Sequence, residues 1–406
     1  MARNGQGSVD PMERSELVAL LSPEGLRLLD ALPPYRSEQD VLRIVSDLRK
    51  QGHSPALVAA VLTQSKLRRK AEAKFGDFAS RMLFTEAGLE QATRLPVAAH
   101  HAGRFRSAGI RRVADLGCGI GGDALAFAAL ELEVTAIEAD EVTAAIASFN
   151  LAPFPSAVVE NQRAEDVDLR EIDGVFLDPA RRTPGHTQTE RLTDPDDYTP
   201  SLGFAYELAT GRSVGLKLGP GFDRDLIPST AEAQWVSADG QVVELGLWFG
   251  ALARPGIRRA ALVLRGDQTD ELVADADSED EDTGPLGEYL YEPDGAVIRA
   301  RLIGDLARRI GGRMLSEQIA YITADAPVET PFAAGFRLLE PLPYAEKELK
   351  RALRQRGIGT LEIKKRGVDV DPAVLRRRLA LNGDRPATLI LTRVAGRHTA
   401  LLAERL

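Results

Sequence analysis

The sequence predicts an α/β protein built on a largely parallel sheet, with a helical domain before it and small α+β modules after it. Two observations carry this prediction. Short apolar runs alternate with helical segments between residues 112 and 218, and a cluster of glycines at residues 117–122 follows the first of these runs. Strands that alternate with helices imply a parallel sheet with right-handed crossovers.

Length and composition bound the class of protein. The chain has 406 residues, a formal net charge of −9, one cysteine and five histidines. This length suggests two or three domains. A single cysteine forbids an intramolecular disulfide and a cysteine-based zinc cluster, and no two histidines have the H-x-x-x-H spacing, so we expect no metal site. The N-terminus lacks the apolar core of a secretory signal, and no stretch reaches the ~20 apolar residues that span a bilayer. We therefore expect a cytoplasmic protein with no membrane segment.

The first part of the chain, to about residue 111, has a helical pattern. Ser22, Pro23 and Glu24 form a helix start: a capping hydroxyl, a proline at the first helical position and an acid near the positive end of the helix dipole. Thr85 and Glu86 open another helical segment. The sequence therefore predicts a helical N-terminal domain over residues 1–90.

The predicted central domain covers residues 91–266. Its expected strands are short apolar runs at 113–116, 134–137, 157–160, 174–177 and 213–218, with helical segments at 123–130 and 142–150. Two further runs, 242–249 and 260–264, are separated by a short segment that contains Pro255 and Gly256. That segment is too short for a parallel crossover, so we expect the last two strands to form an antiparallel hairpin.

Charge is distributed unevenly along the chain. Residues 344–406 contain 15 Lys or Arg and 7 Asp or Glu, a net charge of +8, so the other 343 residues carry −17. Such asymmetry suggests a basic module that meets a polyanion. Residues 267–282 contain nine acids and no base, a pattern typical of a solvated linker. We place this acidic linker at 267–285, followed by modules at 286–343 and 344–406.

The glycine cluster predicts a cofactor site. Gly117, Gly119 and Gly122 match G-x-G-x-x-G between a strand and a helix, where a backbone without side chains can lie against a ligand. Alone, the motif suits dinucleotides and S-adenosylmethionine, or a tight turn that binds nothing. Asp115 could face a ligand's ammonium group, and Glu138 could accept both ribose hydroxyls. An antiparallel hairpin is the sheet ending of class I methyltransferases, so we favour S-adenosylmethionine over NAD.

A second loop, at residues 178–182, predicts the reacting end of the site. The Asp178 carboxylate and the carbonyl groups around Pro179 are acceptors that could hold an exocyclic amino group in line with a methyl donor. Arg181 and Arg182 could bind phosphate. An ordinary Asp-Pro turn with surface arginines is the alternative. Between the two loops, Asp166 could accept from the amino group of adenine, or be a solvated carboxylate.

The segment DLGCGIGGD (115–123), together with Glu138 and DPAR (178–181), resembles class I S-adenosylmethionine-dependent methyltransferases. The preceding segment FTEAGLEQATRLPVAAHHAGRF is similar to the entry segment of the trimethylguanosine-synthase-like group, which methylates guanine N2 in RNA. Over residues 60–406 the chain is most similar to bacterial methyltransferases with a C-terminal THUMP-like domain. In these, a helical region precedes a Rossmann-like methyltransferase domain, and a ferredoxin-like unit precedes the THUMP-like module.

The resemblance implies particular residues. Cofactor contacts are expected at Asp115, Gly117, Cys118, Gly119, Gly121, Asp123, Glu138 and Asp166, with Thr85 and Gln91 as further candidates. Cys118 is read as a small residue packed against the cofactor, not as a nucleophile. Asp178 and Pro179 take the acceptor role. Where amino-group methyltransferases of nucleic acids often carry an aromatic residue after this motif, Ala180 and Arg181 stand here.

The C-terminal module is expected to bind phosphate groups. Residues 361–367 read as a strand that turns into a basic loop, Asp371 and Pro372 begin a helix that carries three arginines, and 388–392 forms a closing strand. Clustered Lys and Arg suit phosphate contacts, which supply affinity without sequence reading. The expected contacts are Lys364, Lys365, Arg366, Arg376 and Arg377. The alternative is a solvated helix face with internal salt bridges.

These predictions combine into a methyltransferase that acts on RNA (rRNA or tRNA), on an exocyclic amino group of a base, with guanine N2 favoured. Two alternatives stay open. The enzyme could methylate a small molecule or a protein, the basic tail being incidental. It could also be a non-catalytic RNA-binding protein that retains the pocket. The oligomeric state is not predicted.

Overall fold

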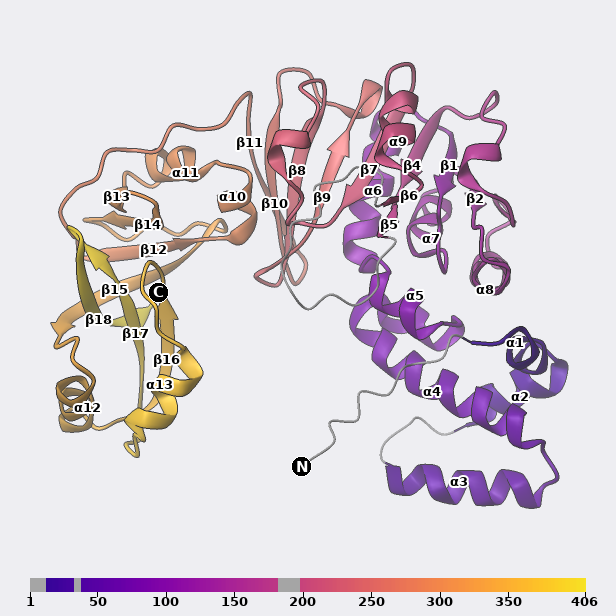
Figure 1. The fold of residues 1–406 in the computed structure, drawn as a ribbon, viewed down its shortest axis with the longest axis horizontal. Helices are drawn as coiled ribbons and strands as arrows, with labels where there is room; N and C mark the ends of the chain where they lie inside the picture. Colours follow the sequence, from indigo (N-terminus) through magenta and orange to yellow (C-terminus); the bar gives the residue numbers. More distant parts are fainter. Residues whose placement is uncertain (1–11, 33–37, 182–197) are drawn as a thin grey trace. The chain divides into compact units, whose positions relative to one another are not determined.

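The computed structural model describes residues 12–32, 38–181 and 198–406 (Figure 1). The chain divides into two compact units: Met1–Leu218 with Leu247–Ala253, and Gly219–Gly246 with Arg254–Leu406. This division falls inside the predicted 91–266 domain, because β8 (Glu232–Ala238) and the first part of β9 (Gln241–Trp248) belong to the second unit.

The first unit begins with helices, as the sequence predicts. They are α1 (Arg14–Leu20), α2 (Pro23–Ala31), α3 (Glu38–Lys50), α4 (Pro55–Phe75), α5 (Glu86–Gln91) and α6 (Leu95–Ser107), with the 3-10 turn η1 (Gly76–Arg81) after α4. The hydroxyl of Ser22 accepts from the N–H of Gly25, and Ser54 caps α4 in the same way, each followed by a proline. Local capping chemistry therefore sets where these helices begin.

The parallel strands of the first unit match the predicted apolar runs. They are β1 (Arg112–Leu116), β2 (Glu133–Ile137), β3 (Ala157–Glu160), β4 (Gly174–Leu177) and β7 (Ser213–Leu218). β1 pairs with β2 and β4, and β3 and β7 extend the sheet on either side, all in parallel. The intervening helices are α7 (Gly122–Ala129), α8 (Glu141–Leu151) and α9 (Leu202–Ala209), and two short strands, β5 (Ala180–Arg181) and β6 (Tyr198–Thr199), pair separately. The carboxyl ends of β1, β2 and β4 therefore meet at one edge, where ligands bind in open α/β sheets.

The predicted final hairpin was wrong in its residues. The nine-stranded sheet has the order β11-β10-β8-β9-β7-β4-β1-β2-β3. Residues 241–248 (β9) are joined to β8 by Asp239 and Gly240, whose φ angles of +51° and +78° suit a two-residue hairpin turn. β10 (Arg259–Arg265) instead pairs with β8 in parallel. β8 was not predicted because polar residues occupy some of its buried positions. Glu232 and Ser237 are fully buried, so the strand does not read as an apolar run.

The predicted acidic linker at 267–285 is not a solvated linker in its first part. β11 (Gln268–Ala274) pairs antiparallel with β10 as the edge strand of the sheet. Within this segment Asp277 accepts hydrogen bonds from Arg224 and Arg259, and Glu271 forms an ion pair with Arg254. Arginines outside the segment thus neutralise two of the acids that a local reading expects to repel one another.

The second unit also contains a seven-stranded sheet of order β13-β14-β12-β15-β18-β17-β16. Its strands are β12 (Tyr289–Pro293), β13 (Arg313–Ser316), β14 (Ile319–Ala324), β15 (Ala333–Leu342), β16 (Ile358–Lys365), β17 (Arg385–Val394) and β18 (Arg397–Arg405). The helices are α10 (Gly295–Arg299), α11 (Ile303–Arg309), α12 (Glu346–Gln355) and α13 (Pro372–Leu379). Because β15 pairs with both β12 and β18, the residues predicted as two modules, 286–343 and 344–406, share one sheet.

Close packing under the sheet of the first unit requires glycine at position 215. A Cβ added to Gly215 would lie 2.7 Å from Cζ3 of Trp248 and 3.2 Å from ring atoms of Phe105 and Phe176. These three rings are buried, with ring centroids 6.3 Å apart for Phe105 and Phe176. The aromatic cluster therefore fixes how closely α6 approaches the strands that carry the site.

We predict that Gly215→Ala destabilises the protein by about 1–3 kcal/mol, because the methyl group overpacks an aromatic core. Thermal unfolding of the purified protein measures this as a lower midpoint. Gly103→Ala, in α6 with open space around its Cβ position, is the matched control and should raise stability by up to ~1 kcal/mol. Equal midpoints for the two variants would contradict the packing argument.

Candidate active site

A cavity of about 520 Å³ lies at the carboxyl ends of the parallel strands in the first unit. Its volume falls in the range of small-molecule sites. The lining residues come from α5 and the segment after it, from the glycine loop and the start of α7, from the loops after β2, β3 and β4, from α8, and from the end of β6. They are Thr85, Ala87, Gly88, Gln91, Ala92, Thr93, Gly117, Cys118, Gly119, Ile120, Gly122, Asp123, Ile137, Glu138, Ala139, Thr143, Gln162, Arg163, Ala164, Glu165, Asp178, Ala180, Thr199 and Pro200.

The glycine loop has the backbone that its sequence predicts. Gly117, Gly119 and Gly121 have φ angles of +83°, +54° and +84°, a region that L side chains rarely adopt. The N–H groups of Gly117 and Cys118 both donate to the carbonyl of Ile137, which ties the loop to the end of β2. A Cβ on Gly119 would meet no atom within 4 Å, so this position is open to a ligand. Gly121, predicted as a contact, packs its backbone against Leu151 and does not line the cavity.

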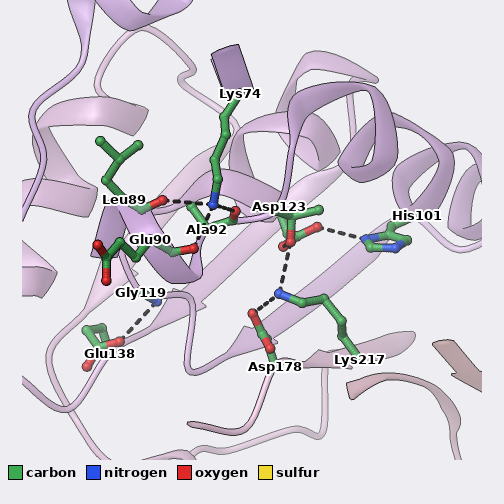
Figure 2. A network of polar contacts seen from close by, with 11 residues as sticks. Lys74, Leu89, Glu90, Ala92, His101, Gly119, Asp123, Glu138, Asp178 and Lys217 are labelled. Carbon is green, nitrogen blue, oxygen red and sulfur yellow. Dashed lines mark hydrogen bonds and ion pairs between the residues drawn. The ribbon is translucent and has the colours of Figure 1, made fainter. Parts of the chain in front are cut away.

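Glu138 stands at the end of β2, beside the glycine loop (Figure 2). One carboxylate oxygen accepts from the N–H of Gly119 at 3.0 Å, and the other accepts from the N–H of Asp140 at 2.9 Å. These bonds aim the half-buried carboxylate along the cavity wall. Carboxylate oxygens accept more than one hydrogen bond each, so Glu138 retains capacity for ribose hydroxyls.

Two acids lie buried beneath the glycine loop. Asp123 accepts from the hydroxyl of Thr93 at 2.7 Å and hydrogen-bonds Nδ1 of His101 at 2.8 Å. Burial alone would raise the pKa of Asp123, but its bond to His101 and the charges of His101 and Lys217 hold that pKa below its ordinary value. Asp115 is 1% exposed and its Oδ2 has no hydrogen-bond partner.

Burial, followed by the negative charges of Asp123 and Asp178, raises the pKa of Asp115 well above its ordinary value. Asp115 is not among the described residues that line the cavity. It lies at the end of β1, the position at which the sequence predicts a carboxylate that faces a ligand's ammonium group. Because Asp115 does not reach the cavity lining, its contact with the cofactor stays a prediction.

Asp178 follows β4 directly and lines the same cavity. Its Oδ2 forms an ion pair with Nζ of Lys217 (Figure 2). Nζ of Lys217 also donates to the hydroxyl of Thr93 at 3.1 Å. Pro179 is buried and Ala180 lines the cavity. The side chain of Arg181 and all of Arg182 lie outside the described residues, so their phosphate contacts stay a prediction.

α5 covers one side of the cavity. Thr85 caps this helix by accepting from the N–H of Gly88 at 2.9 Å, and Gln91 lines the cavity from the last turn. At the other end, Nζ of Lys74 donates to the carbonyls of Leu89, Glu90 and Ala92 at 2.7–2.9 Å (Figure 2). Burial, with the nearby charges of Lys217 and Arg94, lowers the pKa of Lys74 to about 8. Lys74 thus holds the C-terminal end of the covering helix.

The predicted adenine contact does not line the cavity, and the predicted phosphate contacts of the C-terminal module are only partly exposed to solvent. Asp166 is exposed at the end of the 3-10 turn η2 (Ala164–Asp166), and Ala164 and Glu165 line the cavity instead. In the second unit, Lys364 pairs with Glu292 at 2.9 Å and Arg366 pairs with the same carboxylate at 3.6 Å.

On α13, Arg376 donates to the carbonyl of Leu361. Lys365 and Arg377 are exposed. Of the five phosphate contacts predicted in the C-terminal module, three therefore have internal partners and two face solvent.

Sequence reasoning missed Lys217, Thr93, His101 and Lys74. Lys217 carried a usable signal, since it is a lysine inside the buried strand SVGLKL, close to the end where ligands bind. The other three had none, because Lys74, Thr93 and His101 belong to helices or connections that are brought to the site only by folding. Their contacts span from 15 to 124 positions in the sequence.

Comparison with known proteins identifies the family. A family model described as THUMP domain-like matches residues 333–405, and a model for a domain of unknown function matches residues 13–71. Proteins from two strains of Mycobacterium tuberculosis, described as uncharacterized S-adenosylmethionine-dependent methyltransferases, are 36% identical over 350 residues, which cover 84% of this chain and 93% of theirs. A crystal structure from Porphyromonas gingivalis W83, assigned as a methyltransferase, has a TM-score of 0.69 at 24% identity and covers 91% of this chain and 99% of that one, which shows a shared fold.

The sheet order and the cavity at its carboxyl edge are those of the Rossmann-like class I methyltransferase fold. On its likeness to the mycobacterial proteins, the chain belongs to the S-adenosylmethionine-dependent methyltransferases, with a THUMP-like domain at its C-terminus. Its cofactor is S-adenosylmethionine, and the residues present fit that molecule. The open backbone at Gly119 and the Glu138 carboxylate suit a ligand that carries a ribose.

Two absences can be stated for residues 12–32, 38–181 and 198–406. No helix in these ranges is both long enough and apolar enough to cross a membrane. Among the same residues, no three His, Cys, Asp or Glu side chains are grouped so as to hold a metal ion.

We predict that Lys74→Met weakens S-adenosylhomocysteine binding about tenfold, equivalent to ~1.4 kcal/mol, because three carbonyls at the end of α5 lose their donor. Isothermal titration calorimetry measures the Kd. Lys66→Met, on the same helix α4 with its side chain outside this cavity, is the matched control and should leave the Kd within about twofold. An unchanged Kd in Lys74→Met would show that cofactor binding does not depend on the hydrogen bonds from Lys74 to the end of α5.

Proposed function

We propose that this enzyme methylates RNA on an exocyclic amino group of a base, with guanine N2 the favoured atom. The observation that carries the proposal is the position of Asp178. Its carboxylate follows β4 at the edge of the cofactor cavity, on the far side of the glycine loop from Glu138, since β1 lies between β4 and β2. An acceptor placed there can take an N–H bond from an amino group and orient its lone pair.

The cofactor supplies a methyl group activated by a positively charged sulfur. The chain's own residues position the acceptor. Asp178 offers carboxylate oxygens, and its backbone carbonyl lies 3.9 Å from the position of a Cβ on Gly117, so the motif and the glycine loop are neighbours. Transfer from a sulfonium needs alignment more than proton chemistry, so a fixed acceptor is a sufficient contribution from the protein.

The choice of RNA rests on the C-terminal residues. The THUMP-like match covers most of the basic segment, 344–406, with its net charge of +8. α12 and α13 present exposed basic side chains at Lys347, Arg351 and Arg377. The C-terminal end of α13 is bound by Lys350 and Arg354, which donate to the carbonyls of Arg378 and Ala380. Two neighbouring basic helices suit the phosphates of an RNA backbone.

The rival function is methylation of a small molecule or a protein. The ion pairs of Lys364 and Arg366 with Glu292, and of Arg378 with Glu346, favour this reading in part, because they satisfy basic side chains internally. It predicts that nucleic acid neither binds with a steep salt dependence nor accepts methyl groups.

Asp178→Ala should lower methyl transfer to RNA about 100-fold or more, the cost of losing alignment at a reacting group, while the Kd for S-adenosylhomocysteine stays within about threefold. The assay follows tritiated methyl groups from S-adenosylmethionine into total RNA of a strain that lacks this gene, with nucleoside analysis of the product. An equal loss of cofactor affinity would mean that Asp178 is structural. Wild-type protein that labels protein or small molecules but no RNA would refute the substrate.

Exchanging Lys365 and Arg377 together for glutamine should weaken binding to total RNA and flatten its salt dependence by about one unit of log–log slope for each phosphate that is no longer neutralised. Filter binding between about 50 and 200 mM salt measures the slope. Arg49→Gln, an exposed arginine at the end of α3, is the control and should leave the slope unchanged. A double variant with the wild-type slope would remove these residues from the RNA interface.

A further inference from the structure

Lys217 and Asp178 are brought together by strand register. β4 and β7 run in parallel with Leu177 opposite Leu216, and Asp178 and Lys217 are the residues that follow this pair. Neighbouring residues at one register position of a sheet share a face. The face is the one that carries Phe176 and Gly215, two residues earlier on each strand.

This pair lies among several buried charges. The Lys217 side chain is 12% exposed and the Asp178 side chain is 32% exposed. Lys217 also donates to Thr93, whose hydroxyl donates in turn to Asp123. A hydrogen-bonded chain thus connects Asp178, through Lys217 and Thr93, to the buried acid Asp123.

A buried ammonium needs partners, and the groups that Lys217 binds belong to the cavity wall. Its partners Thr93 and Asp178 line the cavity, as does Asp123 beyond Thr93, whereas Lys217 stands behind them. Removing one member of a buried ion pair leaves its partner's charge uncompensated, at a substantial energetic cost. Lys217 is therefore placed to act on a ligand through the residues it holds.

We propose that Lys217 is a positioning residue that holds the Asp178 carboxylate at the methyl-transferring end of the cavity and sets the net charge there. The inference rests on the proposed function in one respect only, that Asp178 faces the transferred methyl group. It requires no particular substrate.

The proposal has a measurable electrostatic consequence. With the ion pair intact, one positive and one negative group offset each other beside the methyl position. Loss of Lys217 leaves a carboxylate there, which attracts a cationic ligand, and loss of the Asp178 charge leaves an ammonium, which repels one. Charges at short range in a partly buried site interact strongly because little water screens them, so a shift in binding preference is large enough to measure.

The experiment compares two cofactor analogues by calorimetry. S-adenosylhomocysteine is neutral at sulfur, and sinefungin carries a protonated amine at the methyl position. Relative to wild type, Lys217→Met should shift the ratio of their Kd values at least about threefold towards sinefungin, and Asp178→Asn should shift it at least about threefold the other way. Lys217→Arg should behave as wild type. Lys50→Met, an exposed lysine on α3, is the control for the substitution itself.

The double variant Lys217→Met/Asp178→Asn removes both charges and should return the ratio to its wild-type value. The double variant is also useful if Lys217→Met alone does not fold, because asparagine at position 178 leaves no carboxylate charge to compensate. In that case Asp178→Asn supplies the shift expected from removing a single charge. Unchanged ratios in the folded single variants would overturn the proposal, as would a double variant that shifts as far as a single one.

Enzyme kinetics distinguish a positioning role of Lys217 from a purely structural one. Lys217→Met should lower kcat about tenfold or more with KM for RNA within about threefold, and its effect on kcat should vanish when Asp178 is already Ala, because Lys217 acts through Asp178. Equal losses in both backgrounds would overturn the positioning role. Since the analogue ratios involve no RNA, shifted ratios without RNA methylation would refute the proposed substrate and leave the role of Lys217 supported.

Discussion

The structure of the site depends on neutralising acids buried at the carboxyl edge of the parallel strands. Asp123 is almost fully buried, and Asp178 is partly so. Buried carboxylates persist in folded proteins only when hydrogen bonds or opposite charges compensate their lost hydration. His101 and Lys217 supply that compensation from α6 and β7. The helices, the strand register and the glycine loop all have to bring these groups within hydrogen-bond distance.

Much of the fold was predictable because local chemistry determines it. Ser22 followed by proline begins a helix, and short apolar runs between glycines form the central parallel strands, with no information from elsewhere in the chain. β8 was missed for the opposite reason. Glu232 is buried against Arg254 of a later loop, so a polar residue occupies a core position that a pattern reading assigns to apolar ones. Glu271 of β11 and Asp277 after it are likewise balanced by arginines outside the acidic segment.

The candidate site likewise contains residues that the local sequence predicts and residues that it does not. The positions of Gly117, Gly119 and Glu138 follow from motif spacing, since a strand, a tight loop and a helix place them with little freedom. Charge counts in the C-terminal segment did not show which basic residues are available, because Glu292, far earlier in the chain, pairs with both Lys364 and Arg366. Contacts made by strand register, such as the pair of Asp178 and Lys217, become visible only once the sheet order is known.

That pair has a consequence for how the sequence can drift. A substitution that removes one of the two charges strands the other in a poorly hydrated setting, which lowers stability before it alters chemistry. Loss of either residue is therefore better tolerated when a compensating change accompanies it. Positions 178 and 217 should accordingly covary among descendants of a common ancestor, and a relative that lacks the lysine should carry a basic side chain from another element in its place.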